Sequence, residues 1–169
     1  NQIIEKNLNL ILTRKLEKEL VSRGATVYLT READKDLSTT TVNRKRSDLY
    51  NRAKYINKIS PNMYISIHLN SVTNSSWRGL QVFYTTKNEE NKLIAETITN
   101  HLKESISNVR EIKKDNTYYM YKHITSPGVL IEAGFISNSN DSYLLRNKEY
   151  QDKLISSISD SIEIYFQKK

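Results

Sequence analysis

Apolar side chains recur every three or four positions near the start of the chain, and this spacing predicts a helix over residues 4–20. The predicted apolar face carries Ile4, Leu8, Ile11, Leu12, Leu16 and Leu20. Gly24 follows at a position where a left-handed residue commonly ends a helix. Residues 25–30 are rich in β-branched and aromatic side chains, so we expect a strand after this helix.

A regular alternation of apolar and polar residues over residues 63–70 predicts a strand with two different faces. One face would carry Met63, Ile65, Ile67 and Leu69, and the other Tyr64, Ser66, His68 and Asn70. Upstream of this strand, apolar residues at helical spacing between Arg46 and Ile56 predict a second helix, which ends before Pro61.

The rest of the chain continues this succession of helices and strands. The further elements expected are strands over 78–85 and 129–132, helices over 88–107 and 147–167, a short element near 118–121 and a loop over 137–141. Strands that alternate with helices of 15–20 residues are typical of α/β architecture. We therefore predict an α/β fold with a mixed, largely parallel sheet, flanked by helices on both faces, in a single domain over residues 1–169.

The composition limits the classes of protein that the chain can represent. Hydrophobic residues make up 37% and charged residues 27% of the chain, which is typical of a folded domain. No apolar run approaches the roughly 18 residues of a membrane-spanning helix. The chain has no cysteine, which excludes disulfides, thiol catalysis and cysteine-ligated zinc.

The net charge of +7 favours an anionic partner such as nucleic acid, anionic lipid or a cell-wall polymer. The basic residues are scattered, and no nucleic-acid-binding motif accompanies them. We therefore expect no nucleic-acid partner. The alternative, a basic nucleic-acid-binding domain, would predict an affinity that falls steeply with salt.

Two residues stand near the predicted carboxyl ends of strands, where ligands bind in sheets of this type. His68 carries an imidazole, a common metal ligand, although simple packing at a strand end also accounts for it. Glu132 follows a short apolar run, and burying a carboxylate there is costly unless the group is paired or used. Glu132 is therefore either half of an ion pair or a general base with a raised pKa.

Glu5 could add a carboxylate ligand to these two residues. A carboxylate at the start of a helix also suits the helix dipole, and this alternative stays open. The other two histidines, His101 and His123, are expected to lie outside the site. A catalytic zinc site needs three protein ligands and one open position, so the residues alone indicate a zinc hydrolase that is one ligand short.

Two motifs are specific: SIHLN at residues 66–70 and EAGFISN at residues 132–138. Three supporting stretches are VYLTR at 27–31, RSDLYNRA at 46–53 and GLQVF at 79–83. In these motifs, their order and their separation, the chain resembles the zinc-dependent N-acetylmuramoyl-L-alanine amidases of the amidase-3 type. The resemblance runs from Glu5 to the last helix, and the compact domain is most similar to the germination-specific, spore-cortex members.

The resemblance implies hydrolysis of the amide between the lactyl group of N-acetylmuramic acid and L-alanine of the stem peptide. Peptidoglycan, and specifically spore cortex, would be the substrate, and the protein would act outside the cytoplasm. The resemblance implies that Glu5 and His68 bind Zn²⁺ and that Glu132 is the catalytic residue. It also places Arg52 and Asn70 near the substrate.

The same family has a first strand and a third zinc ligand, a histidine, upstream of the zinc glutamate. This sequence opens at Asn1, so we expect an N-terminally incomplete catalytic domain that binds zinc weakly by itself. An activating protein partner or self-association could complete the site. The competing hypothesis is a zinc-free, amidase-like module that binds peptidoglycan or a protein partner.

Overall fold

The computed structural model describes residues 2–33 and 35–169, with side chains from residue 5 onward. The helices are α1 (Gln2–Ser22), α2 (Arg44–Ile59), α3 (Glu90–Ser105), α4 (Ser139–Arg146) and α5 (Lys148–Gln167). The strands are β1 (Tyr64–Asn70), β2 (Gln81–Tyr84), β3 (Lys113–Lys114) and β4 (Gly128–Phe135), and a short 3₁₀ helix, η1, spans Tyr121–His123. No helix in the described part of the chain is long and apolar enough to cross a bilayer.

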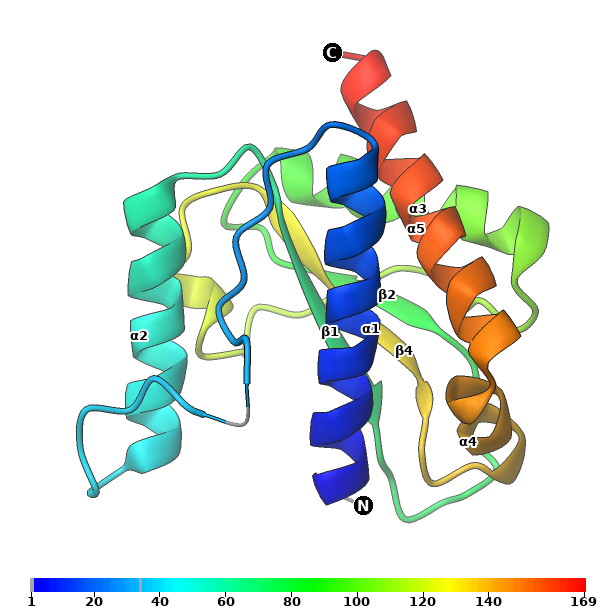
Figure 1. The fold of residues 1–169 in the computed structure, drawn as a ribbon, viewed down its shortest axis with the longest axis horizontal. Helices are drawn as coiled ribbons and strands as arrows, with labels where there is room; N and C mark the ends of the chain where they lie inside the picture. The colour runs from blue at the N-terminus through cyan, green and yellow to red at the C-terminus, as the bar shows by residue number, and fades with distance from the viewer. Residues whose placement is uncertain (1, 34) are drawn as a thin grey trace.

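The four strands form one sheet in the order β1-β4-β2-β3. The pairs β1–β4 and β2–β3 are parallel, whereas β2 and β4 run antiparallel. The prediction of a mixed, largely parallel sheet is therefore confirmed. In Figure 1, α1 lies beside α5 at the front of the sheet, and α2 stands on the far side of β1 from them.

Helices α1, α3 and α5 cover one face of the sheet and form the larger core with it. Leu8, Leu12 and Leu16 of α1 are buried in this core, as predicted. Ile11 is 45% exposed, so its assignment to the buried face was wrong. The helix buries the narrow stripe of leucines spaced four residues apart, and Ile11 lies on the flank of that stripe. The side chain of Ile4 lies outside the described residues.

A smaller core lies on the opposite face, beneath α2 and η1. Ala53 and Ile56 of α2 pack there with Tyr64 and Tyr121, whose rings stack with centroids 5.9 Å apart. Tyr64 shares this face of β1 with Ser66 and His68. The face is therefore buried at the N-terminal end of the strand and polar toward its C-terminal end. Helices on both faces of the sheet are thus confirmed.

The strand predicted over residues 25–30 is not present. Within the described chain, β1 is an edge strand that pairs only with β4. Residues 25–30 form no ladder with its open edge, and strand propensity alone does not supply the hydrogen bonds of a strand. Gly24 does adopt the predicted left-handed conformation, with a φ of 90°.

Two further boundaries differ from the prediction. Strand β4 continues to Phe135, so Glu132 lies inside the strand and not at its end. Pairing with β1 extends it, because Asn70 of β1 lies opposite Phe135, whereas the ladder with β2 ends at Glu132. Residues 137–141 are not a loop throughout, because α4 begins at Ser139, where the Asn138 side chain accepts hydrogen bonds from two backbone N–H groups. The short element expected near 118–121 occurs as η1 a few residues later.

Candidate active site

The pairing of β1 with β4 sets the frame of the site. In this parallel register, His68 lies directly opposite Glu132. Gly128 permits the close approach at the start of the pair, because a Cβ at that position would lie 2.2 Å from the carbonyl oxygen of Tyr64. Two residues that are 64 positions apart in sequence therefore become neighbours on one face of the sheet.

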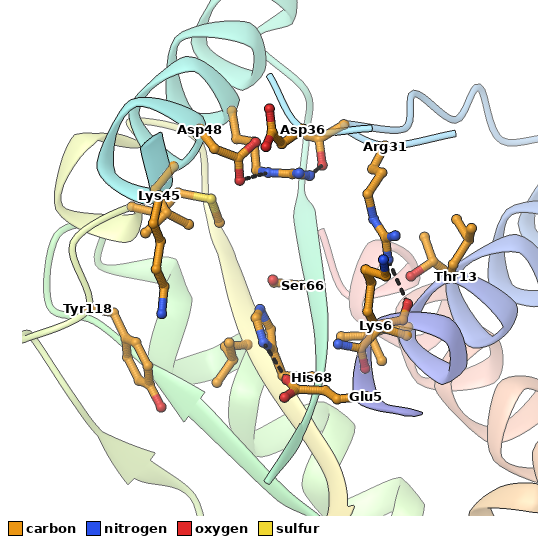
Figure 2. Close-up of a pocket in the computed structure, with 18 of the residues that line it drawn as sticks. Glu5, Lys6, Thr13, Arg31, Asp36, Lys45, Asp48, Ser66, His68 and Tyr118 are labelled. Atoms are coloured by element: carbon orange, nitrogen blue, oxygen red, sulfur yellow. Dashed lines mark hydrogen bonds and ion pairs between the residues drawn. The ribbon is translucent and has the colours of Figure 1, made fainter. Parts of the chain in front are cut away.

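The first turn of α1 brings Glu5 to the same place. Its Oε1 lies 3.6 Å from Nδ1 of His68, as Figure 2 shows. The hydrogen bond with His68 is the largest cause of a lowered pKa for Glu5, and the Asn9 side chain and the backbone N–H of Leu69 act in the same direction. Glu5 is therefore held as a carboxylate next to the imidazole.

Glu132 differs from Glu5 in its surroundings. It is only 8% exposed, and its Oε2 is buried without a hydrogen-bond partner. Burial raises the pKa of Glu132 to about 7; the nearby charge of His68 lowers it and that of Glu5 raises it further. The three residues singled out in the sequence thus interact with one another, and Glu132 is poised to exchange a proton near neutral pH.

Glu5 and His68 border a cavity of about 940 Å³ between α1, α2 and β1, whereas Glu132 is not among its lining residues. Glu5 lines it from α1 and His68 lines it from β1. Figure 2 shows Ser66 next to His68 on β1, with Tyr118 and Lys45 on the opposite side of the same space. The cavity is large enough for a small peptide or sugar unit.

Arg52 and Asn70 lie in different positions relative to this cavity. Arg52 lines it, but its guanidinium is engaged with Asp48 at 2.9 Å and with the Thr30 hydroxyl at 3.2 Å. Arg52 therefore links Thr30, in the segment before α2, to Asp48 of that helix. Asn70 accepts a hydrogen bond from the backbone N–H of Ile136 through its carbonyl oxygen and is not among the cavity's lining residues.

The two other histidines lie elsewhere. His101 contacts Glu104 of α3 and Asp160 of α5. His123 packs against the rings of Tyr50 and Tyr119. Lys45 and Tyr118 are lining residues that the sequence did not point to. They reach the cavity only because α2 and the segment before η1 pack against the sheet, and no local pattern signals that packing.

The donor atoms at this site suit zinc, which takes imidazole nitrogen and carboxylate oxygen ligands. Glu5 is ionised, as a ligand must be, and the buried Oε2 of Glu132 has no partner. The described residues contain no group of three or more His, Asp or Glu side chains placed to hold a metal. Glu5 and His68 therefore offer two ligands, with Glu132 beside them.

Comparison with known proteins places this arrangement in a family. Residues 1–164 match the Amidase_3 family model, described as N-acetylmuramoyl-L-alanine amidase. The chain belongs to the Amidase_3 family. It is 38% identical over 173 residues to the germination-specific N-acetylmuramoyl-L-alanine amidase of Bacillus subtilis, covering 99% of this chain and 73% of that protein.

Solved structures of amidases share its fold. The CwlD amidase of Clostridioides difficile, in complex with the GerS lipoprotein, has a TM-score of 0.91 and 35% identity, covering 98% of this chain and 87% of that one. The catalytic domain of CwlV from Bacillus (Paenibacillus) polymyxa var. colistinus has a TM-score of 0.83 and 27% identity, covering 98% and 86%. This Amidase_3 chain therefore has the sheet and helices of known amidase domains.

Proposed function

We propose that this chain is a zinc-dependent N-acetylmuramoyl-L-alanine amidase that cleaves the amide between the muramic lactyl group and L-alanine in peptidoglycan. The observation that carries the proposal is the buried Glu132 carboxyl, which has a partnerless oxygen and faces the Glu5–His68 pair across two paired strands. Membership of the Amidase_3 family supports the same reaction.

The roles follow from the chemistry of each group. Glu5 and His68 would hold the zinc ion, together with a third protein ligand from outside the described residues. Zinc, when bound, supplies Lewis acidity, which makes water more acidic and polarises an amide carbonyl. Glu132 accepts the proton of the attacking water and returns it to the leaving amine of L-alanine. Burial, which raises its pKa in the metal-free protein, favours a group that can both take up and return a proton.

Spore cortex is the form of peptidoglycan that we propose as substrate. The support is the likeness to a germination-specific amidase and to the CwlD amidase. Such a substrate lies outside the cytoplasm, so we propose that the protein acts there. A protein partner or a second copy of the chain that completes the metal site stays a prediction.

The proposal is tested by replacing the carboxyl of Glu132 without changing its shape. In an enzyme whose metal site is complete, Glu132→Gln is expected to retain zinc and to lose at least about a hundredfold in rate, because its amide cannot take up a proton. The measurement is the release of new L-alanine amino termini from purified peptidoglycan, with zinc per chain determined by elemental analysis. His101→Ala, outside the site, is the control, and near-normal turnover by Glu132→Gln would remove this residue from the mechanism.

A further inference from the structure

The carboxylates that line the active-site cavity are all paired, whereas two of its lysines, Lys35 and Lys45, have no side-chain partner among the described residues. Three acidic residues line it among those that the structure describes. Asp36 pairs with Arg44 at 2.6 Å, Asp48 pairs with Arg52 at 2.9 Å, and Glu5 pairs with His68 at 3.6 Å. The cavity's own carboxylates are therefore already engaged.

Lys45 has no such counterpart. It lies in the first turn of α2, lines the cavity, and has no ion-pair or hydrogen-bond partner in the described part of the chain. Figure 2 shows its side chain extending from α2 toward the side of the cavity where Tyr118 and His68 lie. A positive charge is thus directed into the cavity without an ion-pair partner among the described residues.

Tyr118 offers a second donor in the same region. Its ring is held edge-on by Phe83 and Tyr121, with centroids 6.2 and 5.6 Å away. Its hydroxyl has no hydrogen-bond partner among the described residues. Burial raises the pKa of Tyr118 to about 12, with a smaller contribution from the charge of Glu132. The hydroxyl therefore keeps its proton and can act as a hydrogen-bond donor.

We propose that Lys45 and Tyr118 form a subsite that binds a carboxylate of the stem peptide, on the leaving-group side of the scissile amide. An ammonium and a phenol hydroxyl are both donors, and a carboxylate accepts from both. Lys45 and Tyr118 line the same cavity as the Glu5–His68 pair, which places this subsite beside the proposed metal ligands. The stem-peptide residue after L-alanine carries a free α-carboxylate, only one residue of about 3.3–3.6 Å beyond the L-alanine.

The proposal rests on the proposed amidase function, and two ligands separate the two questions. N-acetylmuramoyl-L-alanyl-D-glutamate and N-acetylmuramoyl-L-alanyl-D-isoglutamine differ only in one carboxylate, which is a carboxamide in the second. Binding of each is measured by NMR titration, which detects millimolar affinities, with Glu132→Gln protein so that neither ligand is turned over. The Glu132→Gln protein, which retains Lys45, is expected to bind the carboxylate ligand about tenfold more tightly than the carboxamide ligand. A tenfold difference in Kd is the typical contribution of a charge-assisted hydrogen bond.

Variants of Lys45 and Tyr118 then test which residue provides the preference for the carboxylate ligand. Lys45→Met is expected to bind the carboxylate ligand about tenfold more weakly and the carboxamide ligand unchanged. Lys45→Arg should keep most of the preference, and Tyr118→Phe should lose part of it. Lys54→Met, on the same helix but not among the cavity's lining residues, is the matched control and should behave like the parent protein.

Three results would overturn the proposal in different ways. No weakening of either ligand by Lys45→Met would show that Lys45 binds no carboxylate of the peptide. Equal weakening of both would show that Lys45 does not recognise the α-carboxylate in which the two ligands differ, since both keep the γ-carboxylate. Absence of binding of both ligands to the parent protein would contradict the proposed amidase function, and the subsite with it.

Discussion

At the scale of single residues, the same side-chain type is given two different properties by its surroundings. Glu5 and Glu132 both carry a carboxyl close to His68. Hydrogen bonds lower the pKa of Glu5, and burial raises the pKa of Glu132. One carboxyl is thereby kept as a permanent anion suited to a metal, and the other exchanges protons near neutrality.

The raised pKa of Glu132 predicts a dependence of stability on pH. Between pH 4.5 and about 7 the folded protein binds more protons at this group than the unfolded chain does, so stability falls as the pH rises through this range. The full difference is about 3 kcal/mol at 1.36 kcal/mol per pKa unit. Glu132→Gln should therefore match wild type at pH 4 and exceed it by up to about 3 kcal/mol at pH 8.

Urea unfolding of both proteins at each pH, with a chelator present, measures this difference. The chelator is needed because a bound cation would itself favour the carboxylate. Parallel stability curves for wild type and Glu132→Gln across the whole pH range would contradict the assigned pKa.

At the scale of elements, the site depends on how three of them meet. The first turn of α1 carries Glu5, β1 carries His68, and β4 carries Glu132. The β1–β4 register is the critical relation, because a slip by one residue would turn either side chain to the opposite face of the sheet. Gly128, at the start of β4, lets the two strands come together.

Gly128→Ala is therefore expected to disturb the β1–β4 pair. Its Cβ would collide with the carbonyl oxygen and ring of Tyr64, and overpacking of this kind costs about 1–3 kcal/mol. For a chain of this size each kcal/mol lowers the Tm by about 2–4 °C. Calorimetry gives the Tm, and hydrogen exchange of the β1 amides locates the effect.

Gly24→Ala is the control for this prediction. Nothing lies within 4 Å of a Cβ at Gly24, so only its left-handed backbone is penalised. Faster exchange in β1 is expected for Gly128→Ala and not for Gly24→Ala. Unchanged exchange in both variants would show that the strands tolerate the extra methyl group.

At the scale of the whole molecule, the proposed metal site would join α1 to the sheet. A ligand that binds only the folded state stabilises it, and zinc at about 100 times its Kd would add about 2.7 kcal/mol. We expect a rise in Tm of about 5–10 °C when zinc is added to the metal-free wild type. Glu5→Gln and His68→Ala should each show a much smaller rise.

Thermal unfolding with and without zinc tests this prediction, and His101→Ala controls for zinc bound elsewhere on the surface. The same rise in all four proteins would exclude Glu5 and His68 as the ligands. A rise that requires protein concentrations high enough for self-association would indicate that a second copy completes the site.

The sequence by itself determined what is local or periodic. The alternation over residues 63–70 and the leucine spacing of the first helix predicted β1 and α1, and the motifs around His68 and Glu132 predicted the family. These signals are readable because each depends on neighbours a few positions away in the chain.

The tertiary structure decided what depends on contacts between distant segments. Residues 25–30 have strand propensity but form no ladder, and β4 extends beyond its predicted end because it pairs with β1 as far as Phe135. The Glu5–His68 contact, the partnerless oxygen of Glu132, and the position of Lys45 and Tyr118 all arise from packing. Hydrogen-bond partners, burial and cavity walls come from residues far away in the sequence, so no local pattern carries them.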